Sequence, residues 1–339
     1  MKQQLIAILL FSVFISSSTF VLSMPVTQQH ETNTITLSLT VSDLTITQKE
    51  EYISLSIPEA TGSTITATHP ELPRITETLT LPFGSTIDSI TFQSTGTESM
   101  SLDAKIIPVA YPTPIDTTID TKKREVNQEI YTSSNPYPFN QLESKIAAGL
   151  NKGKLVNMLT LNWYPAQYLP ASNKLMFSKE ITITITYTPG SPLVEKTNEN
   201  KLVIIGPEAF ADEAQPLVNH KNNLGLSTVY ASLEQVYQQY EGRDPAEQIK
   251  YYLYDSAKNQ GTTFVLLLGN VDITPMREAA IHFYHDENII TDLYYADVFE
   301  SDGSFSSWDS NNNDQFSEYN WDDGLIDTVD LYPDLYVGR

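Results

Sequence analysis

The stretch "KLVIIG" at residues 201–206 decides the fold of the second half of this 339-residue chain. Its unbroken apolar run predicts a strand that is buried on both faces, as in a parallel sheet covered by helices. A second apolar run, "TFVLLLGN", follows at 263–270, and segments with helical spacing lie between the two. This alternation of strands and helices predicts an α/β region with a mainly parallel sheet over residues 201–339.

One of these helices is predicted in detail, from residue 244 to residue 259. Asp244 can accept backbone N–H groups as the N-cap, Pro245 suits the first helical position, and Glu247 occupies the capping-box position. Gly261 suits the left-handed backbone that commonly ends a helix. The residues spaced for one apolar face of this helix are Ala246, Ile249, Leu253 and Ala257.

Upstream of residue 201 the periodicity changes to that of half-buried strands. In "TITLSLTVSDLTIT" at 34–47 and "EITITITYTP" at 180–189, apolar residues alternate with threonine and serine. Strands with one apolar face need a second sheet to bury it, so we expect a β-rich domain over 24–188, built as an antiparallel sandwich. The polar stretch "PGSPLVEKTNEN" at 189–200 lacks any period and predicts a linker.

The N-terminal segment "MKQQLIAILLFSVFISSSTFVLSM" has the features of a secretory signal. Lys2 precedes an apolar stretch at 5–15, and small residues near 21–23 suit cleavage, so residues 1–23 are predicted to be a signal peptide. The alternative is an uncleaved membrane anchor, but the apolar stretch is about half of the ~20 residues needed to span a bilayer. We therefore expect a secreted, extracellular protein with no membrane span after signal removal.

Composition excludes several functions. The chain has 42 acidic and 20 basic residues, a formal net charge of -22, and no cysteine. A surface this negative repels phosphate, so nucleic acid is not an expected partner. Without cysteine the chain has neither a disulfide nor a thiol nucleophile.

The acidic stretch "WDSNNNDQFSEYNWDD" at 308–323 is the strongest candidate for a binding site. Asp309, Asn311 and Asn313 alternate as in the first half of a calcium loop, where a tight turn aims three oxygen side chains at one point. The Gln315 carbonyl and the Glu318 carboxylate are placed to complete the shell. The pattern predicts a Ca²⁺ site.

The match to a calcium loop is incomplete. Asp314 stands at the sixth position, where such loops usually have glycine, and no flanking helices are evident. The alternative is an Asn- and Asp-rich surface loop that binds no ion.

The order of several segments resembles the opening half of gingipain-type cysteine peptidases. The resemblance is carried by "KLVIIGPEAF", "TFVLLLGNVDITP", "TDLYYAD" and "YPDLYVGR", with "PELPRITETLTLPFG" and "LNWYPAQYLPASNKLMFSKEITITITY" resembling the propeptide before such domains. It implies a β-rich propeptide-like domain, an incomplete caspase-like α/β domain, and protein or peptide substrates for the complete enzyme. It also implies that Asp292, and behind it Asp297, help to hold calcium. Gly269-Asn270 replaces the usual Gly-Asp of the family.

In this family the catalytic His and Cys follow the segment that corresponds to "GR" at 338–339. The resemblance therefore implies a chain truncated before the catalytic dyad, with no catalytic residue of its own, and expected to be inactive as given. The first interpretation is the N-terminal portion of a secreted gingipain-like cysteine endopeptidase. The alternative is a non-catalytic secreted module, for calcium binding or adhesion, derived from such a peptidase.

Overall fold

The structure is a computed structural model that describes residues 32–111, 124–190, 201–282, 286–320 and 324–339. Glu31–Arg339 forms one compact unit. The predicted signal peptide and residues 191–200 of the predicted linker lie outside the described residues. Independent folding of 24–188 stays a prediction. Within the described ranges, no helix is long and apolar enough to cross a membrane.

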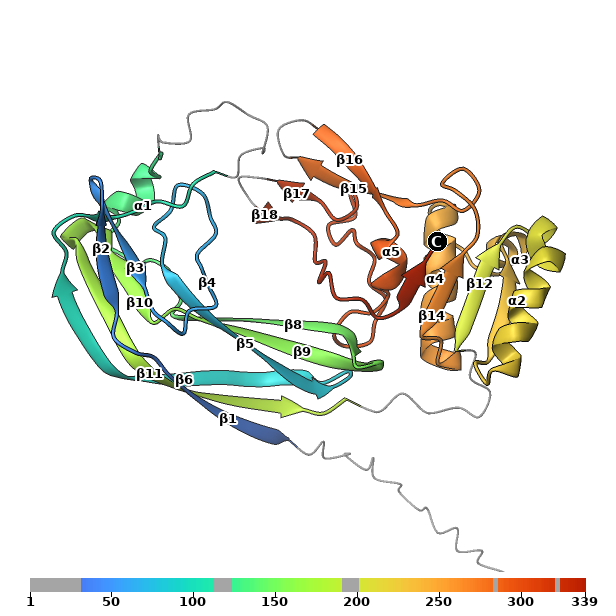
Figure 1. Cartoon of the computed structure of the whole chain (residues 1–339), viewed down its shortest axis with the longest axis horizontal. Helices are drawn as coiled ribbons and strands as arrows, with labels where there is room; N and C mark the ends of the chain where they lie inside the picture. The colour runs from blue at the N-terminus through green and yellow to red at the C-terminus, as the bar shows by residue number, and fades with distance from the viewer. Residues whose placement is uncertain (1–31, 112–123, 191–200, 283–285, 321–323) are drawn as a thin grey trace, which may run out of the picture. The chain divides into compact units, whose positions relative to one another are not determined.

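Antiparallel pairing dominates the first part of the chain (Figure 1). One sheet has the order β1-β11-β10, with β6 also paired to β11, a second has the order β4-β5-β9-β8, and a small third has the order β2-β3-β7. The strands are β1 (Asn33–Thr40), β2 (Thr45–Lys49), β3 (Tyr52–Ser56), β4 (Gly62–Ser63), β5 (Pro73–Pro82), β6 (Thr86–Ser101), β7 (Lys105–Ile106), β8 (Leu142–Asn151), β9 (Lys154–Trp163), β10 (Ala166–Leu169) and β11 (Lys174–Thr188).

The alternating pattern of the sequence sets the register of these strands. Ile181, Ile183 and Ile185 of β11 are fully buried, whereas the threonines between them face the other side. Together with the fully buried Trp163 they belong to a core cluster contributed by the sheets of the first part. The alternation in "EITITITYTP" therefore predicted this strand correctly. The short helix α1 (Gln128–Thr132) and the 3-10 turn η1 (Pro170–Ser172) lie in the same part of the chain.

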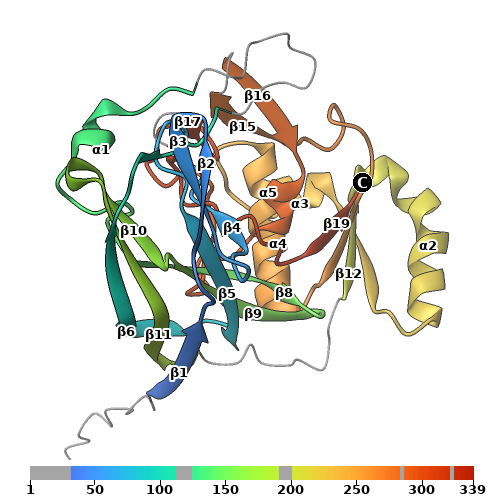
Figure 2. The same ribbon diagram turned by 60° about the vertical axis from the view of Figure 1, so that its left-hand side comes forward.

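A parallel sheet follows, with the order β13-β12-β14-β19. Helices α4 and α2 lie on opposite faces of this sheet (Figure 2). Alternate residues of β12 pack on these two sides: Val203 and Ile205 belong to a cluster with α4, and Ile204 packs with Val218 of α2. The apolar run "KLVIIG" is thus a strand buried on both faces, as predicted. The elements are β12 (Leu202–Gly206), η2 (Glu208–Phe210), α2 (Ala211–Asn223), β13 (Thr228–Ser232), α3 (Leu233–Gln239), α4 (Pro245–Gln260), β14 (Phe264–Leu267) and β19 (Tyr336–Gly338).

The ends of α4 agree with the sequence in all but one detail. Asp244 caps the helix by accepting the Glu247 N–H at 2.9 Å, and Gly261 ends it with φ 73°. The Glu247 carboxylate, however, accepts the N–H of Arg243 rather than that of Asp244. The carboxylate bonds one residue before the N-cap because it also accepts two hydrogen bonds, at 2.8 and 2.9 Å, from the Arg243 guanidinium.

A second, mixed sheet with the order β16-β15-β17-β18 was not predicted from the sequence. Its strands β15 and β16 form an antiparallel hairpin, and β17 joins β15 in parallel. The elements of this part are β15 (Arg277–His282), β16 (Asp286–Thr291), α5 (Leu293–Ala296), β17 (Tyr319–Asn320) and β18 (Gly324–Leu325).

Two residues of the β-rich part belong to the core of the α/β part. Phe83, in the turn after β5, packs edge-on against Phe299 with ring centroids 5.2 Å apart, and Ala148 of β8 is fully buried in the same cluster. Close by, the buried amide of Asn157 donates to the carbonyls of both Ser85 and Ser301, at 3.0 and 2.8 Å. The α/β core is therefore complete only with side chains from upstream.

We expect Phe83→Ala to lower the free energy of unfolding by about 3 kcal/mol, because it leaves a cavity in this shared core. Phe92→Ala is the matched control, since Phe92 lies on β6 and is 46% exposed. Denaturant unfolding followed by near-ultraviolet circular dichroism measures both. Equal losses in the two variants would show that the Phe83 ring does not close the core.

Candidate functional site

The acidic loop 309–318 is folded around the carboxylate of Asp309, which is 1% exposed. One oxygen of Asp309 accepts the Asn313 N–H at 3.0 Å, and the other accepts the Asp314 N–H at 3.1 Å. The side-chain carbonyl of Asn311 accepts the Asn313 N–H at 3.0 Å, and that of Asn313 accepts the Gln315 N–H at 2.9 Å. Side-chain oxygens thus hold the tight turn that the spacing suggested.

The residue at the sixth position adopts the conformation that glycine would provide. Asp314 has φ 64°, in the left-handed region that aspartate tolerates better than most residues. The missing glycine therefore does not prevent the backbone path of a calcium loop.

The structure brings four of the five predicted loop ligands together. Glu318 accepts from the side-chain amides of Asn311 and Asn313, at 3.3 and 3.0 Å, and both asparagines bond within the turn around Asp309. The side chain of Gln315 instead lines a neighbouring pocket. Among the described residues no group of three His, Cys, Asp or Glu side chains could hold a metal ion, so any ion here would depend on amide and backbone oxygens.

An arginine already supplies positive charge to this loop. Arg243 donates to Asp309 at 2.5 Å and to Asp314 at 3.1 Å, and its other nitrogens bind Glu247. Burial acts to raise the pKa of Asp309, but the bonds from Arg243 and from the Asn313 and Asp314 amides outweigh it and lower that pKa. Sequence reasoning missed Arg243, which lies 66 residues away along the chain.

The two aspartates implied by the family resemblance lie apart from the loop's turn. Asp292 makes a bidentate ion pair with Arg339, at 2.6 and 2.8 Å. Asp297 is 1% exposed and accepts the indole N–H of Trp308 at 2.6 Å. Calcium binding by Asp292 and Asp297 stays an expectation of the resemblance, while both carboxylates already face basic or N–H groups.

A buried lysine lies near Asp297. Lys250 of α4 is fully buried, with its ammonium 4.1 Å from the ring centre of Tyr294 and 5.2 Å from that of Trp308. Burial lowers the pKa of Lys250 to about 7, against the opposing charges of Asp297 and Asp334. Burial raises the pKa of Asp297, even though Lys250 acts in the other direction. The helical spacing from Ala246 could have revealed Lys250, because i and i+4 share a face.

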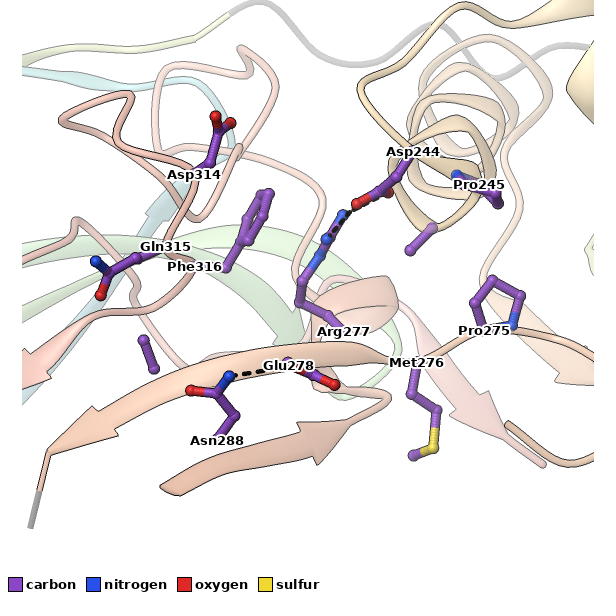
Figure 3. A pocket seen from close by; sticks show the side chains of 12 residues that line it. Asp244, Pro245, Pro275, Met276, Arg277, Glu278, Asn288, Asp314, Gln315 and Phe316 are labelled. Carbon is purple, nitrogen blue, oxygen red and sulfur yellow. Dashed lines mark hydrogen bonds and ion pairs between the residues drawn. The ribbon is translucent and has the colours of Figure 1, made fainter. Parts of the chain in front are cut away.

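A pocket of about 560 Å³ opens beside the loop (Figure 3). One wall is formed by Arg277, whose guanidinium binds both oxygens of Asp244 at 2.6 and 2.9 Å and stacks 3.7 Å from the ring centre of Phe316. This ion pair ties the N-cap of α4 to strand β15. The remaining lining residues are Pro245, Ala246, Pro275, Met276, Glu278, Ala280, Asn288, Asp314 and Gln315.

Two family models match overlapping parts of the chain. The model of the C25 propeptide family matches residues 23–211, more than half of the 339 residues, and the model of peptidase family C25 matches 195–339. The search of curated proteins returned no match.

Solved structures give weaker similarities. One concerns zymogenic latency of gingipain K from Porphyromonas gingivalis, at 20% identity over 49% of this chain and 95% of that chain, with a TM-score of 0.37. Another is the complex of RgpB pro- and mature domains from the same organism, at 15% identity over 54% of this chain and 90% of that one, with a TM-score of 0.38. At such values these structures identify neither activity nor substrate.

Two substitutions at Asp244 separate its two contributions. Asp244→Asn keeps a capping oxygen but leaves Arg277 without its ionic partner, so we expect a loss of about 2 kcal/mol in the free energy of unfolding. Asp244→Ala removes the cap as well, for roughly 1 kcal/mol more. Thermal and denaturant unfolding measure the loss in both variants. If each variant lost less than about 0.5 kcal/mol, as ordinary surface substitutions do, the result would contradict a structural role for the pair of Asp244 and Arg277.

Proposed function

Because the chain belongs to peptidase family C25, as its propeptide followed by the start of the gingipain-like peptidase domain, we propose that residues 24–188 keep a secreted cysteine endopeptidase latent. The observation that carries this proposal is the order of the two family matches along one chain. The substrates of the complete enzyme would be proteins or peptides. The signal at 1–23 would direct it out of the cell.

The shared core supports a role of the upstream region in folding as well. Phe83 and Ala148 complete the cluster around Phe299 and Trp308, so the peptidase portion has unburied apolar surface without them. A region that supplies part of another region's core stabilises the folded form of that region, because it packs on the folded state and not on the unfolded one. We propose that the antiparallel sheets form a sandwich and that the parallel sheet is the core of a caspase-like domain.

Residues 1–339 do not supply the nucleophile of such an enzyme. Hydrolysis by this family needs a thiolate that attacks the peptide carbonyl and a base that generates it, and the sequence has no cysteine. These residues can therefore serve the enzyme by supporting its fold and by controlling the access of substrate to its active site.

The latency proposal is tested with the complete gene product, in which residues 191–200 are replaced by the recognition site of an unrelated protease. We expect no hydrolysis of fluorogenic peptides before cleavage and the appearance of activity after it. Equal activity before and after cleavage would contradict latency. A complete product without peptidase activity in either form would favour the non-catalytic alternative.

We also propose that the loop 309–318 binds Ca²⁺ as a structural ion, through Asp309, Asn311, Asn313, the backbone carbonyl of Gln315 and Glu318. The turn around Asp309, which brings the Asn311, Asn313 and Glu318 side chains together, supports the proposal. In the structure the asparagine amide nitrogens donate to Glu318, so these bonds would have to rearrange when an ion binds. Ca²⁺ accepts six to eight oxygen ligands of this kind in flexible geometry. The Arg243 guanidinium competes for the same carboxylate.

Calcium should raise the melting temperature of the chain. At a free calcium concentration of a hundred times Kd, the free energy of unfolding should increase by roughly 2.7 kcal/mol. Glu318→Gln should reduce this response, because it removes a charge from the ligand set and keeps the shape. Arg243→Gln should increase it, because the competing cation is gone, and Mg²⁺ should stabilise less than Ca²⁺ because it demands stricter geometry. A melting temperature that calcium does not change in the parent chain would show that the loop is closed by Arg243 and its own hydrogen bonds alone.

A further inference from the structure

Strand β16 lies at one end of its sheet, and among the described residues no other strand pairs with its outer edge. The strand contains neither proline nor lysine, which commonly block the edges of sheets. Its neighbouring residues Ile289 and Ile290 point to opposite faces and are 52% and 51% exposed. The strand therefore presents a free edge with apolar side chains, the feature to which an extended polypeptide adds as a further strand.

The pocket of about 560 Å³ opens beside this hairpin and shares one of its faces (Figure 3). Its lining includes Glu278 and Ala280 of β15 and Asn288 of β16. Asn288 pairs with Ala280, and Glu278 lies two residues from Ala280, so all three belong to the same face. A residue directly across from Asn288 on an added strand would point to this face as well. An added strand would thus carry one side chain to the pocket.

The charges of the lining leave one carboxylate available to a ligand. Arg277 is already paired with Asp244, at 2.6 and 2.9 Å, and Asp314 accepts a bond from Arg243 at 3.1 Å. Glu278 is exposed, accepts the side-chain amide of Asn288 at 3.0 Å, and forms no ion pair with a described residue. Its negative charge is therefore free to meet a cation.

The rest of the lining is largely apolar and consists mainly of Pro245, Ala246, Pro275, Met276 and Phe316. An apolar wall beside a free carboxylate suits a long side chain with an apolar stem and a cationic head, as in lysine and arginine. A metal ion fits less well, because no three His, Asp or Glu side chains of the described residues are grouped to hold one. A second copy of this chain fits poorly too, because its net charge of -22 would repel the acidic pocket.

We propose that β16 binds an extended polypeptide segment as an added strand, and that the pocket receives a basic side chain of that segment, whose charge Glu278 meets. The proposal rests on the proposed function, because it assigns a binding site for the proteins or peptides on which such an enzyme would act. Backbone hydrogen bonds to β16 supply affinity for any extended segment, and the pocket supplies the preference for a basic residue.

Fluorescence anisotropy with labelled peptides and the full chain tests both parts of this proposal. The probe is a short peptide of alternating threonine and valine with one central lysine. In a matched peptide the lysine is acetylated, which keeps the stem and removes the charge. We expect the lysine peptide to bind about tenfold more tightly, the effect of one charge-assisted hydrogen bond. Methylation of alternate backbone nitrogens should weaken binding by about tenfold or more, because it removes donors from the added strand.

Glu278→Gln removes the charge of the proposed partner and keeps its shape and its acceptor for Asn288. We expect this variant to bind the lysine peptide as weakly as the parent chain binds the acetylated one, and to bind the acetylated peptide as the parent does. The matched control is Glu213→Gln, which alters an exposed carboxylate of α2 outside the pocket and should behave as the parent.

The comparison of peptides on the parent chain does not depend on how well a variant folds. Equal affinity for the lysine and acetylated peptides would overturn the role of the pocket, and equal affinity for the methylated and unmethylated peptides would overturn strand addition. A parent chain that sediments as a dimer and becomes a monomer in Ile290→Lys would assign the edge to a second copy and overturn the proposal. The absence of any peptide binding would overturn the site itself. Latency would still be judged by the cleavage experiment, because binding is measured here without hydrolysis.

Discussion

The core of the peptidase portion is closed by side chains from the region that precedes it. Phe83 and Ala148 lie more than fifty residues upstream of the first strand of the parallel sheet, yet they pack in its hydrophobic cluster. The edge of β8 is paired by the same portion through the Leu150 and Ala148 amides. Because these groups bury apolar surface and satisfy polar atoms at once, the two family regions stabilise each other rather than lying side by side.

Paired charges organise the peptidase portion in a chain whose net charge is -22. Arg243 joins α4 to the acidic loop, and Arg277 joins the N-cap of α4 to strand β15. Lys250 brings an ammonium into a site walled by aromatic rings. Where such a partner is scarce, as around Asp330, burial raises the pKa of the carboxyl.

Local patterns predicted the parts of the fold that depend on neighbours in sequence. The alternation in β11, the doubly buried β12 and both ends of α4 follow from residue periods and caps. The turn around Asp309 was also predicted from the sequence, because its hydrogen bonds join residues only a few positions apart. The hairpin of β15 and β16, the pairing of Arg243 with Asp309, and the insertion of Phe83 were not. They depend on which distant segments meet, and neither hydrophobic period nor propensity carries that information.

Formation of one disulfide tests the contact between the two regions most directly. A Cβ built on Gly149 would lie 2.9 Å from the Cβ of Tyr332 and 2.7 Å from the Cε of Met158, and the chain has no native cysteine to interfere. The first distance is shorter than the range of about 3.5–4.5 Å that disulfides require, so the two segments must move slightly apart for this disulfide to form. After cleavage within 191–200, Gly149→Cys with Tyr332→Cys should keep the two fragments joined on a non-reducing gel. Gly153→Cys with Tyr332→Cys should not, because a Cβ at position 153 meets nothing within 4 Å. Fragments that separate in the first pair, or that join equally in both, would contradict a shared core.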